Sequence, residues 1–276
     1  DLGRSLKTRR SGLIGILIPA LTESFSAEII GRAEEIFAQR AYGTLVCDTM
    51  YSEQRERAYV DLFLRKRVDG VIAVPTTDDG RVYARLCDAG VPLVLIDKQL
   101  DVPADAYLLD NFAAAYDVAR RICAAGHTRI GMLAGREGLQ SADERVAGFT
   151  AGLADNGGAE LLLERGDYTQ KETARLTTER LLSQKPTAVF ASNYYYTLSL
   201  LSVLNRTGDR PAYVGFDDLH FTELVRPTPS LVTQPMTEYG RLAAEKLLAR
   251  LEGDDSPHGT VRLPAGFLDN DSLRPA

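Results

Sequence analysis

Short apolar runs alternate with stretches of helical periodicity along most of the chain. The runs cover residues 13–18, 44–47, 71–74, 92–96 and 107–109, and then 130–134, 161–163, 188–191 and 213–216. Ser52 is expected to cap the helix that ends near Lys66, with Glu53 and Glu56 in its first turn. Near-continuous apolar strands separated by helices are typical of buried parallel strands in right-handed βαβ units. The pattern therefore predicts an α/β protein with two lobes, each built on a doubly wound parallel sheet.

The last fifth of the chain departs from this alternation. Pro227, Pro229 and Pro235 punctuate an extended stretch, which a helix at 236–251 and short strands at 261–263 and 267–268 are expected to follow. A chain that ends this way can cross back to its first half and then return to its second. We therefore expect an N-terminal lobe of residues 12–109 plus 235–263 and a C-terminal lobe of residues 110–234 plus 264–276. Three crossing segments would join them, with a ligand cleft between the lobes.

The composition fits a globular protein and excludes disordered chains, collagen-like repeats and disulfide-scaffold folds. The chain has 276 residues, of which 45% are hydrophobic and 25% are charged, so it can bury a core without metals or disulfides. The first ten residues carry a net charge of +3, which leaves −9 on the rest because the total is −6. An acidic body does not bind DNA phosphates broadly, since that binding depends on Lys and Arg. The longest apolar stretch, 13–21, is far short of the ~20 residues of a membrane span.

The reactive side chains do not form a catalytic or metal-binding pattern. Cys47, Cys87 and Cys123 form no C-x-x-C pair, which favours reduced core thiols in a cytoplasmic protein. The sequence contains neither G-x-G-x-x-G after a strand, nor a phosphate loop, nor a G-x-S-x-G elbow. His258 lies in a polar loop and is expected to be solvated. We therefore expect no enzyme activity, no cofactor and no metal site.

The predicted strand exits carry acidic, amide and hydroxyl side chains from both halves of the chain. Asp97, Asn193 and Asp217 are examples. In doubly wound sheets a ligand binds at the carboxyl ends of the strands. Such a set of side chains suits a neutral polar ligand with several hydroxyl groups.

Several strings, taken together and in order, resemble one known family. They are R-S-L-K-T at 4–8 ahead of G-L-I-G at 12–15, F-S-A-E-I-I at 25–30, R-V-D-G-V-I at 67–72, G-H-T-R-I at 126–130, R-V-A-G-F at 145–149, V-G-F-D-D at 214–218 and T-Q-P at 233–235. Their order and spacing are similar to those of the LacI/GalR-type bacterial transcriptional repressors, over almost the whole chain.

The resemblance implies a periplasmic-binding-protein-like core that binds a small effector between two lobes. It also implies a homodimer and an N-terminal helix-turn-helix headpiece that reads operator DNA and is missing from these residues. Residues 1–11 then correspond to the remnant of a hinge helix and linker. Leu6 occupies the position of a leucine that wedges between minor-groove base steps, with Lys7 beside it to meet the groove or phosphates. The alternative is a solvated basic tail.

The resemblance also implies a set of ligand-binding residues. Arg145 matches an arginine that holds the ligand, and its guanidinium fork suits vicinal hydroxyls or a carboxylate. Asp97 and Asp217 match hydrogen-bond acceptors at strand ends, and Tyr168 matches an aromatic residue that stacks on the ligand. The remaining expected contacts are Phe25, Ser26, Ser141, Asn193 and Gln234. Alternatives are a surface ion pair for Arg145, caps for the two Asp residues, core packing for Tyr168 and Phe25, and a hinge contact for Gln234. Tyr194 and Ala20 depart from the family pattern, because Asp usually stands at both positions.

These features favour a sugar or sugar derivative as the effector, and Leu139 argues against a purine. Effector binding is expected to select one lobe orientation, shift the N-terminal lobes of the dimer and thereby change operator affinity. A periplasmic solute-binding protein of a transporter is the main alternative, and an α/β enzyme is a further one.

Overall fold

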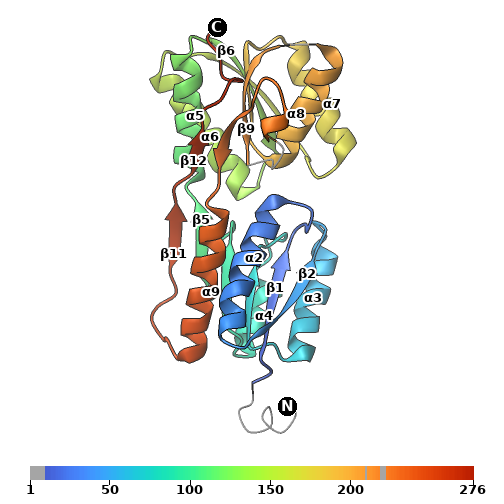
Figure 1. Cartoon of the computed structure of the whole chain (residues 1–276), viewed down its shortest axis with the longest axis vertical. Coiled ribbons are helices and arrows are strands. Elements are labelled where there is room, and N and C mark those ends of the chain that lie inside the picture. Colours follow the sequence, from blue (N-terminus) through green and yellow to red (C-terminus); the bar gives the residue numbers. More distant parts are fainter. Residues whose placement is uncertain (1–9, 209, 218–221) are drawn as a thin grey trace. The chain divides into compact units, whose positions relative to one another are not determined.

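A computed structural model describes residues 10–208, 210–217 and 222–276 (Figure 1). The chain forms two compact units. Unit 1 comprises the described residues up to Leu109 together with Pro235–Leu263, and unit 2 comprises those of Asp110–Gln234 together with Pro264–Ala276. Leu6 and Lys7 lie outside the described residues, so their expected contact with DNA stays a prediction.

Unit 1 is a six-stranded parallel sheet covered by helices on both faces. Its strand order is β11-β5-β4-β3-β1-β2. The strands are β1 (Leu13–Ile18), β2 (Gly43–Asp48), β3 (Gly70–Ala73), β4 (Leu93–Ile96), β5 (Asp105–Leu109) and β11 (Thr260–Leu263). The helices are α2 (Ser24–Gln39), α3 (Glu53–Lys66), α4 (Arg81–Asp88) and α9 (Met236–Glu252). Along β1, Ile14, Ile16 and Ile18 pack under α2 and α9, while Leu17 packs under α3 and α4 on the other face.

Unit 2 repeats this plan. Its strand order is β12-β10-β9-β8-β6-β7. The strands are β6 (Arg129–Gly135), β7 (Glu160–Gly166), β8 (Ala188–Ala191), β9 (Ala212–Phe216), β10 (Ser230–Thr233) and β12 (Gly266–Leu268). The helices are α5 (Asn111–Ala124), α6 (Gln140–Asp155), α7 (Lys171–Ser183) and α8 (Tyr194–Thr207), with a 3₁₀ turn, η1 (Thr222–Leu224).

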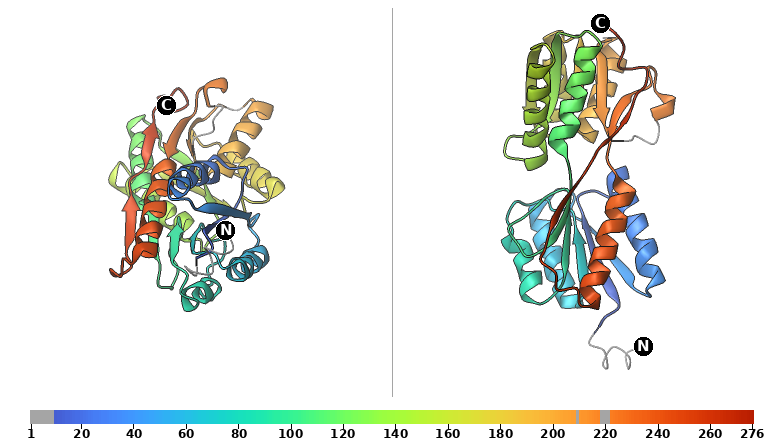
Figure 2. Two further views of the ribbon diagram at one scale, coloured as in Figure 1. Left: turned by 60° about the horizontal axis from the view of Figure 1, so that its bottom comes forward. Right: turned by 90° about the vertical axis from the view of Figure 1, so that its left-hand side faces the viewer.

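Glycines bring one pair of helices close together in each unit. In unit 2, Gly148 of α6 lies against the backbone of α5, where a methyl group would overlap the carbonyl oxygen of Phe112. In unit 1, a methyl group at Gly240 of α9 would lie 2.6 Å from the carbonyl oxygen of Ile29 in α2. Figure 2 shows α2 and α9 side by side along the sheet. The R-x-x-G-F string thus contains a packing glycine that fixes the position of Arg145 relative to α5.

The predicted two-lobe α/β fold is confirmed, with three local differences. The helical periodicity of residues 27–40 predicts a helix that starts at residue 27, whereas α2 begins at Ser24, because Phe25 and Ser26 are already buried in its first turn. Strand β7 is longer than the expected 161–163, because its polar residues Glu164 and Arg165 continue the pairing with β6. Strand β12 is antiparallel to β10, so the sheet of unit 2 is not purely parallel.

The cysteines and the helices add two further observations. All three cysteines are free thiols, with Cys47 buried and Cys87 and Cys123 half-buried. Burial raises the pKa of the Cys47 thiol. None of the helices in the described ranges is long and apolar enough to cross a membrane.

Candidate functional site

Unusual backbone conformations gather where strands end. Seven non-glycine residues of the described chain have a positive φ, and three of them follow helices, where a left-handed residue is ordinary. The other four follow strands: Met50 and Tyr51 after β2, Asp97 after β4 and Asp217 after β9. A left-handed conformation is costly for most L-residues, and such residues cluster at binding sites. This marks the carboxyl end of each sheet as the candidate functional edge.

Asp97 and Asp217 occupy equivalent places in the two units. Each follows the third strand of its sheet order, with φ values of 68° and 70°. The Asp97 amide donates to the carbonyl oxygen of Tyr107 at 2.9 Å, and the Asp217 amide donates to that of Val232 at 2.8 Å. Both aspartates therefore stand at the strand exits that the sequence predicted.

Asp217 and Gln234, two predicted ligand contacts, meet in unit 2. The Asp217 side chain is only 6% exposed, and its Oδ1 accepts a hydrogen bond from Gln234 Nε2 at 2.8 Å. Gln234 follows β10, the strand beside β9. The bond fixes the amide, and Gln234 Oε1 is buried with no hydrogen-bond partner in the described chain. The pair therefore presents acceptor oxygens at adjacent strand exits.

Arg145, on α6, is 6% exposed and held rigidly. Its Nε donates to Asn111 Oδ1 at 2.8 Å, and Nη1 donates to the carbonyl oxygen of Ser192 at 2.6 Å. The guanidinium carbon lies 3.7 Å from the centre of the Phe216 ring, a stacking contact. No carboxylate in the described ranges forms an ion pair with it, so the predicted alternative of a surface ion pair is wrong.

Asn111 and Glu144 orient Arg145, and no motif in the sequence pointed to either residue. Asn111 Nδ2 donates to Glu144 Oε2 at 3.2 Å, and Gln140 Nε2 donates to Glu144 Oε1 at 3.0 Å. The contact between Asn111 and Arg145 spans α5 and α6, 34 residues apart. The one signal in the sequence was a polar residue just beyond the exit of β5. In the structure, Asn111 is buried, with 2% of its surface exposed.

Tyr168 and Asn193 have structural partners in unit 2. The Tyr168 ring stacks on Tyr195 with centroids 5.9 Å apart and meets Tyr196 edge-on at 6.1 Å. Asn193 caps α8, because its Oδ1 accepts from the Tyr196 amide at 2.9 Å. Tyr194, which stands where the family has Asp, packs edge-on against Tyr195. The strand exits of β7 and β8 are thus lined by tyrosines.

The remaining predicted contacts lie in first turns of helices. Phe25 packs edge-on against Tyr239 of α9, with centroids 6.2 Å apart. Ser26 is fully buried, and its hydroxyl has no hydrogen-bond partner among the described residues. Ser141 is half-buried at the start of α6. For all of these residues the role in ligand binding stays a prediction.

Glu56 supports the strand-exit loops of unit 1, a role that its place in the first turn of α3 did not reveal. Its carboxylate is fully buried and accepts from the amides of Thr76 and Thr77 at 2.9 and 2.8 Å, and from the hydroxyl of Tyr83. Burial raises the pKa of Glu56 in spite of these hydrogen bonds. Thr76 is linked in turn to Thr49 by a 2.9 Å hydroxyl contact. Glu56 therefore fixes the exit of β3 directly and, through Thr76, is linked to the exit of β2, on the other side of β1.

Comparisons with known proteins agree with this architecture. Residues 11–258 match the family model described as periplasmic binding proteins and sugar binding domain of LacI family. The chain is 28% identical to the HTH-type transcriptional repressor CytR of Escherichia coli K12, over 99% of this chain and 82% of that protein. A LacI family transcriptional regulator from Enterococcus faecium with bound ribose superposes with a TM-score of 0.85 at 24% identity, over 96% and 99% of the two chains. A complex of the transcriptional regulator CelR with cellobiose gives 0.84 at 24%, over 98% and 89%.

Proposed function

Because the chain belongs to the family of periplasmic binding proteins and LacI-type sugar-binding domains, we propose that it is the effector-sensing part of a transcriptional regulator. CytR, which matches 99% of this chain and is matched over 82% of its own length, is a transcriptional repressor, and this favours a regulator over the binding protein of a transporter. The effector is a sugar or sugar derivative. Related structures with bound ribose and cellobiose support this class of ligand.

The buried guanidinium of Arg145 carries the proposal. Buried charges in proteins are normally paired or hydrogen-bonded, because an unpaired buried charge is costly. Among the described residues no carboxylate forms an ion pair with Arg145, and its two hydrogen bonds to Asn111 and Ser192 leave Nη2 to donate to a ligand. A ligand with several oxygen acceptors supplies what the guanidinium lacks. Arg145 is therefore the primary ligand anchor.

The other predicted residues complete the ligand contacts. Asp97 and Asp217 accept hydrogen bonds from ligand hydroxyls, and Gln234 holds Asp217 in place and offers its own oxygen. Tyr168 and Phe25 cover apolar faces of the sugar ring. Ser26, Ser141 and Asn193 add hydrogen bonds.

A thermal-shift screen with a matched control tests the proposal. The panel contains D-ribose, cellobiose, other sugars, sugar acids, polyols and nucleobases. A specific ligand raises the melting temperature by an amount that grows with its concentration over Kd. A saturable shift from a sugar that is lost in Arg145→Ala and kept in Arg120→Ala supports the proposal, because Arg120 pairs with Asp117 on the exposed surface. A shift from nucleobases alone, or an unchanged shift in Arg145→Ala, contradicts it.

The regulator acts as a homodimer in the cytoplasm and contacts operator DNA through Leu6, Lys7 and a headpiece. Leu224 supports a self-association surface, since it is 85% exposed in unit 2. Exposed Glu223 and Arg226 flank it with opposite charges, which can pair with each other across a two-fold axis when the same patch of two copies meets. Light scattering after size exclusion is expected to give a dimer for the parent chain and a monomer for Leu224→Asp. An unchanged dimer in the variant would remove Leu224 from the interface.

A further inference from the structure

The R-V-D-G string builds a junction between α3, β3 and α9. Arg67 ends α3 in the left-handed conformation, with φ 54°. Val68 is buried in the core beside α3. A methyl group at Gly70 would lie 2.9 Å from Leu247 Cδ1 of α9. Arg67 therefore ends the helix, Val68 and Gly70 have packing roles, and Asp69 is left for a different one.

Asp69 holds the segment that enters β1. Its Oδ1 accepts from the Ser11 amide at 2.8 Å, and its Oδ2 accepts from the Gly12 amide at 2.9 Å. The Ser11 hydroxyl donates to Oδ1 at 3.2 Å as well. The Asp69 amide donates to the carbonyl oxygen of Leu13 at 2.8 Å. One residue thus fixes three successive residues at the point where the chain enters the sheet.

Arg10 ties the same segment to the C-terminal end of α9. Its guanidinium donates to the carbonyl oxygen of Leu251 in the last turn of α9 and lies 3.4 Å from the hydroxyl of Tyr42. A cation at a helix C-terminus is favoured by the helix dipole. Figure 1 shows the end of α9 and the start of β1 at the same end of unit 1.

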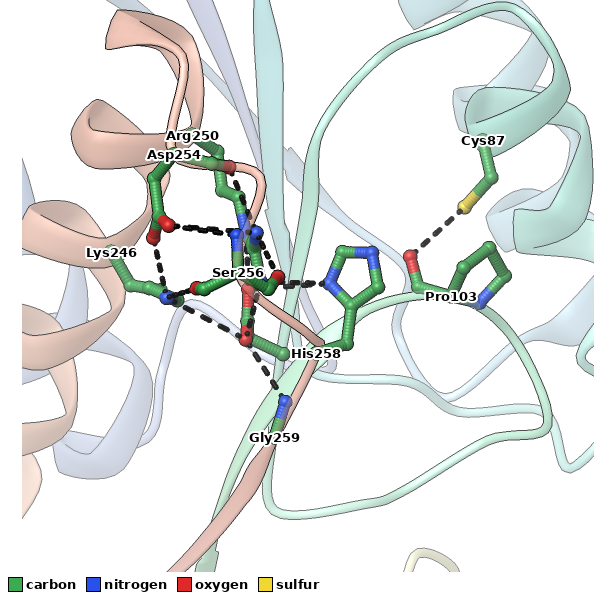
Figure 3. A network of polar contacts seen from close by, with 9 residues as sticks. Cys87, Pro103, Lys246, Arg250, Asp254, Ser256, His258 and Gly259 are labelled. Carbon is green, nitrogen blue, oxygen red and sulfur yellow. Dashed lines mark hydrogen bonds and ion pairs between the residues drawn. The ribbon is translucent and has the colours of Figure 1, made fainter.

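A polar cluster fixes this end of α9. Arg250 donates to both oxygens of Asp105 at 2.9 and 3.1 Å. Lys246 donates to Asp254 at 2.7 Å (Figure 3). His258 is exposed, as expected, and its Nδ1 also lies 3.2 Å from Arg250 Nη2. The cluster joins α9 to the starts of β5 and β11, and it makes the end of the helix a firm attachment point for Arg10.

Helix α9 connects this attachment to the candidate ligand edge through the chain itself. It begins two residues after Gln234 and contains 17 residues. At about 1.5 Å per residue, its two ends are ~25 Å apart. Pro235, the residue before α9, follows the predicted ligand contact Gln234. At the other end of the helix, the carbonyl oxygen of Leu251 accepts a hydrogen bond from Arg10.

We propose that Asp69 is a positioning residue that fixes the direction in which the N-terminal segment leaves unit 1, with Arg10 tying that segment to the far end of α9. The inference rests on the proposed function, in which this segment leads to the part that contacts operator DNA. Asp69 does not touch the ligand. Its loss therefore separates the departing segment from unit 1 and leaves ligand binding intact.

Hydrogen–deuterium exchange of the Ser11 and Gly12 amides tests this role in Asp69→Ala and Asp69→Asn. Hydrogen bonds to a charged acceptor are stronger than those to a neutral one, so their loss makes local opening of these amides more favourable. Exchange of the two amides is therefore expected to speed up about tenfold to a hundredfold. Asp69→Asn keeps one acceptor oxygen and should give a smaller increase. Asp61→Ala is the matched control, because Asp61 of α3 forms an exposed ion pair with Arg85 of α4.

Trypsin cleavage after Arg10 gives a second readout, since a protease needs the flanking residues released from unit 1. Faster cleavage in Asp69→Ala, with exchange inside β1 and the melting temperature close to those of Asp61→Ala, supports the positioning role. Exchange at Ser11 and Gly12 within twofold of the control would overturn it. Equally raised exchange across all of β1 would also overturn it, because Asp69 would then stabilise the sheet as a whole. Failure of the proposed function is distinct: the parent chain would give no saturable shift with the sugar panel.

Discussion

The left-handed backbone at Asp217 allows the side chain's chemistry to be separated from its conformation. Asn tolerates a φ of 70°, whereas Ala at such a position costs about 1–2 kcal/mol. Asp217→Asn keeps the shape of the side chain and removes its charge. Each kcal/mol shifts the melting temperature of a chain of this size by roughly 2–4 °C. Asp217→Ala should therefore melt about 2–8 °C below Asp217→Asn.

Ligand affinity should respond in a different order from stability. If Asp217 accepts hydrogen bonds from ligand hydroxyls, a charged acceptor worth about 1.5–3 kcal/mol is lost in both variants. Kd should rise about tenfold to 150-fold in Asp217→Asn as well as in Asp217→Ala. Isothermal titration with the sugar identified by the thermal-shift panel measures this change. Unaltered affinity in Asp217→Asn would show that the carboxylate serves only to hold Gln234, and the assignment of Asp217 as a ligand contact would be refuted.

Three further substitutions test the supporting structure. Glu56→Ala should destabilise the chain by about 3 kcal/mol in urea unfolding, since three buried donors lose their acceptor; a change below 0.5 kcal/mol would contradict the role given to Glu56. Gly148→Ala should cost about 1–3 kcal/mol because α5 must move away from α6, and an unchanged midpoint would show that the helices separate freely. The pKa of Asp105 lies below its usual value, because the hydrogen bonds from Arg250 outweigh the opposing effect of burial. Its stabilising contribution is therefore complete above the unfolded pKa of about 4 and is lost as the pH falls below it. Asp105→Asn removes this contribution, so its melting temperature should fall less steeply than that of the parent chain as the pH drops below about 4.

Local signals predicted the fold well, because strands and helices here depend mainly on nearby residues. The helix capped by Ser52 ends at Lys66 as expected, and β1 spans 13–18 as expected. Side-chain partners that lie far apart in sequence were not predictable. Glu56 was identified only as a first-turn acid, yet its burial depends on Tyr83, 27 residues later. Which side chains face each other across a site depends on tertiary packing, and residue spacing does not encode it.

The candidate site shows the same division. The strand-exit positions of Asp97 and Asp217 followed from the apolar runs before them, and their equivalence follows from the shared strand order of the two sheets. The orientation of Arg145 did not follow, because Asn111 belongs to a helix that starts 34 residues earlier. A motif can therefore identify a ligand anchor while leaving unseen the residues that aim it.

The equivalence of Asp97 and Asp217 leads to a last prediction. Both follow the third strand of their sheets, both are left-handed, and both have their amide bonded to the next strand. If each unit contributes one acceptor to the ligand, Asp97→Asn should raise Kd by a factor similar to that of Asp217→Asn. The fold should survive, since Asn tolerates the φ of 68°. Titration of the two variants in parallel decides the matter: a large effect of Asp217→Asn with none of Asp97→Asn would mean that unit 2 alone holds the ligand's hydroxyls.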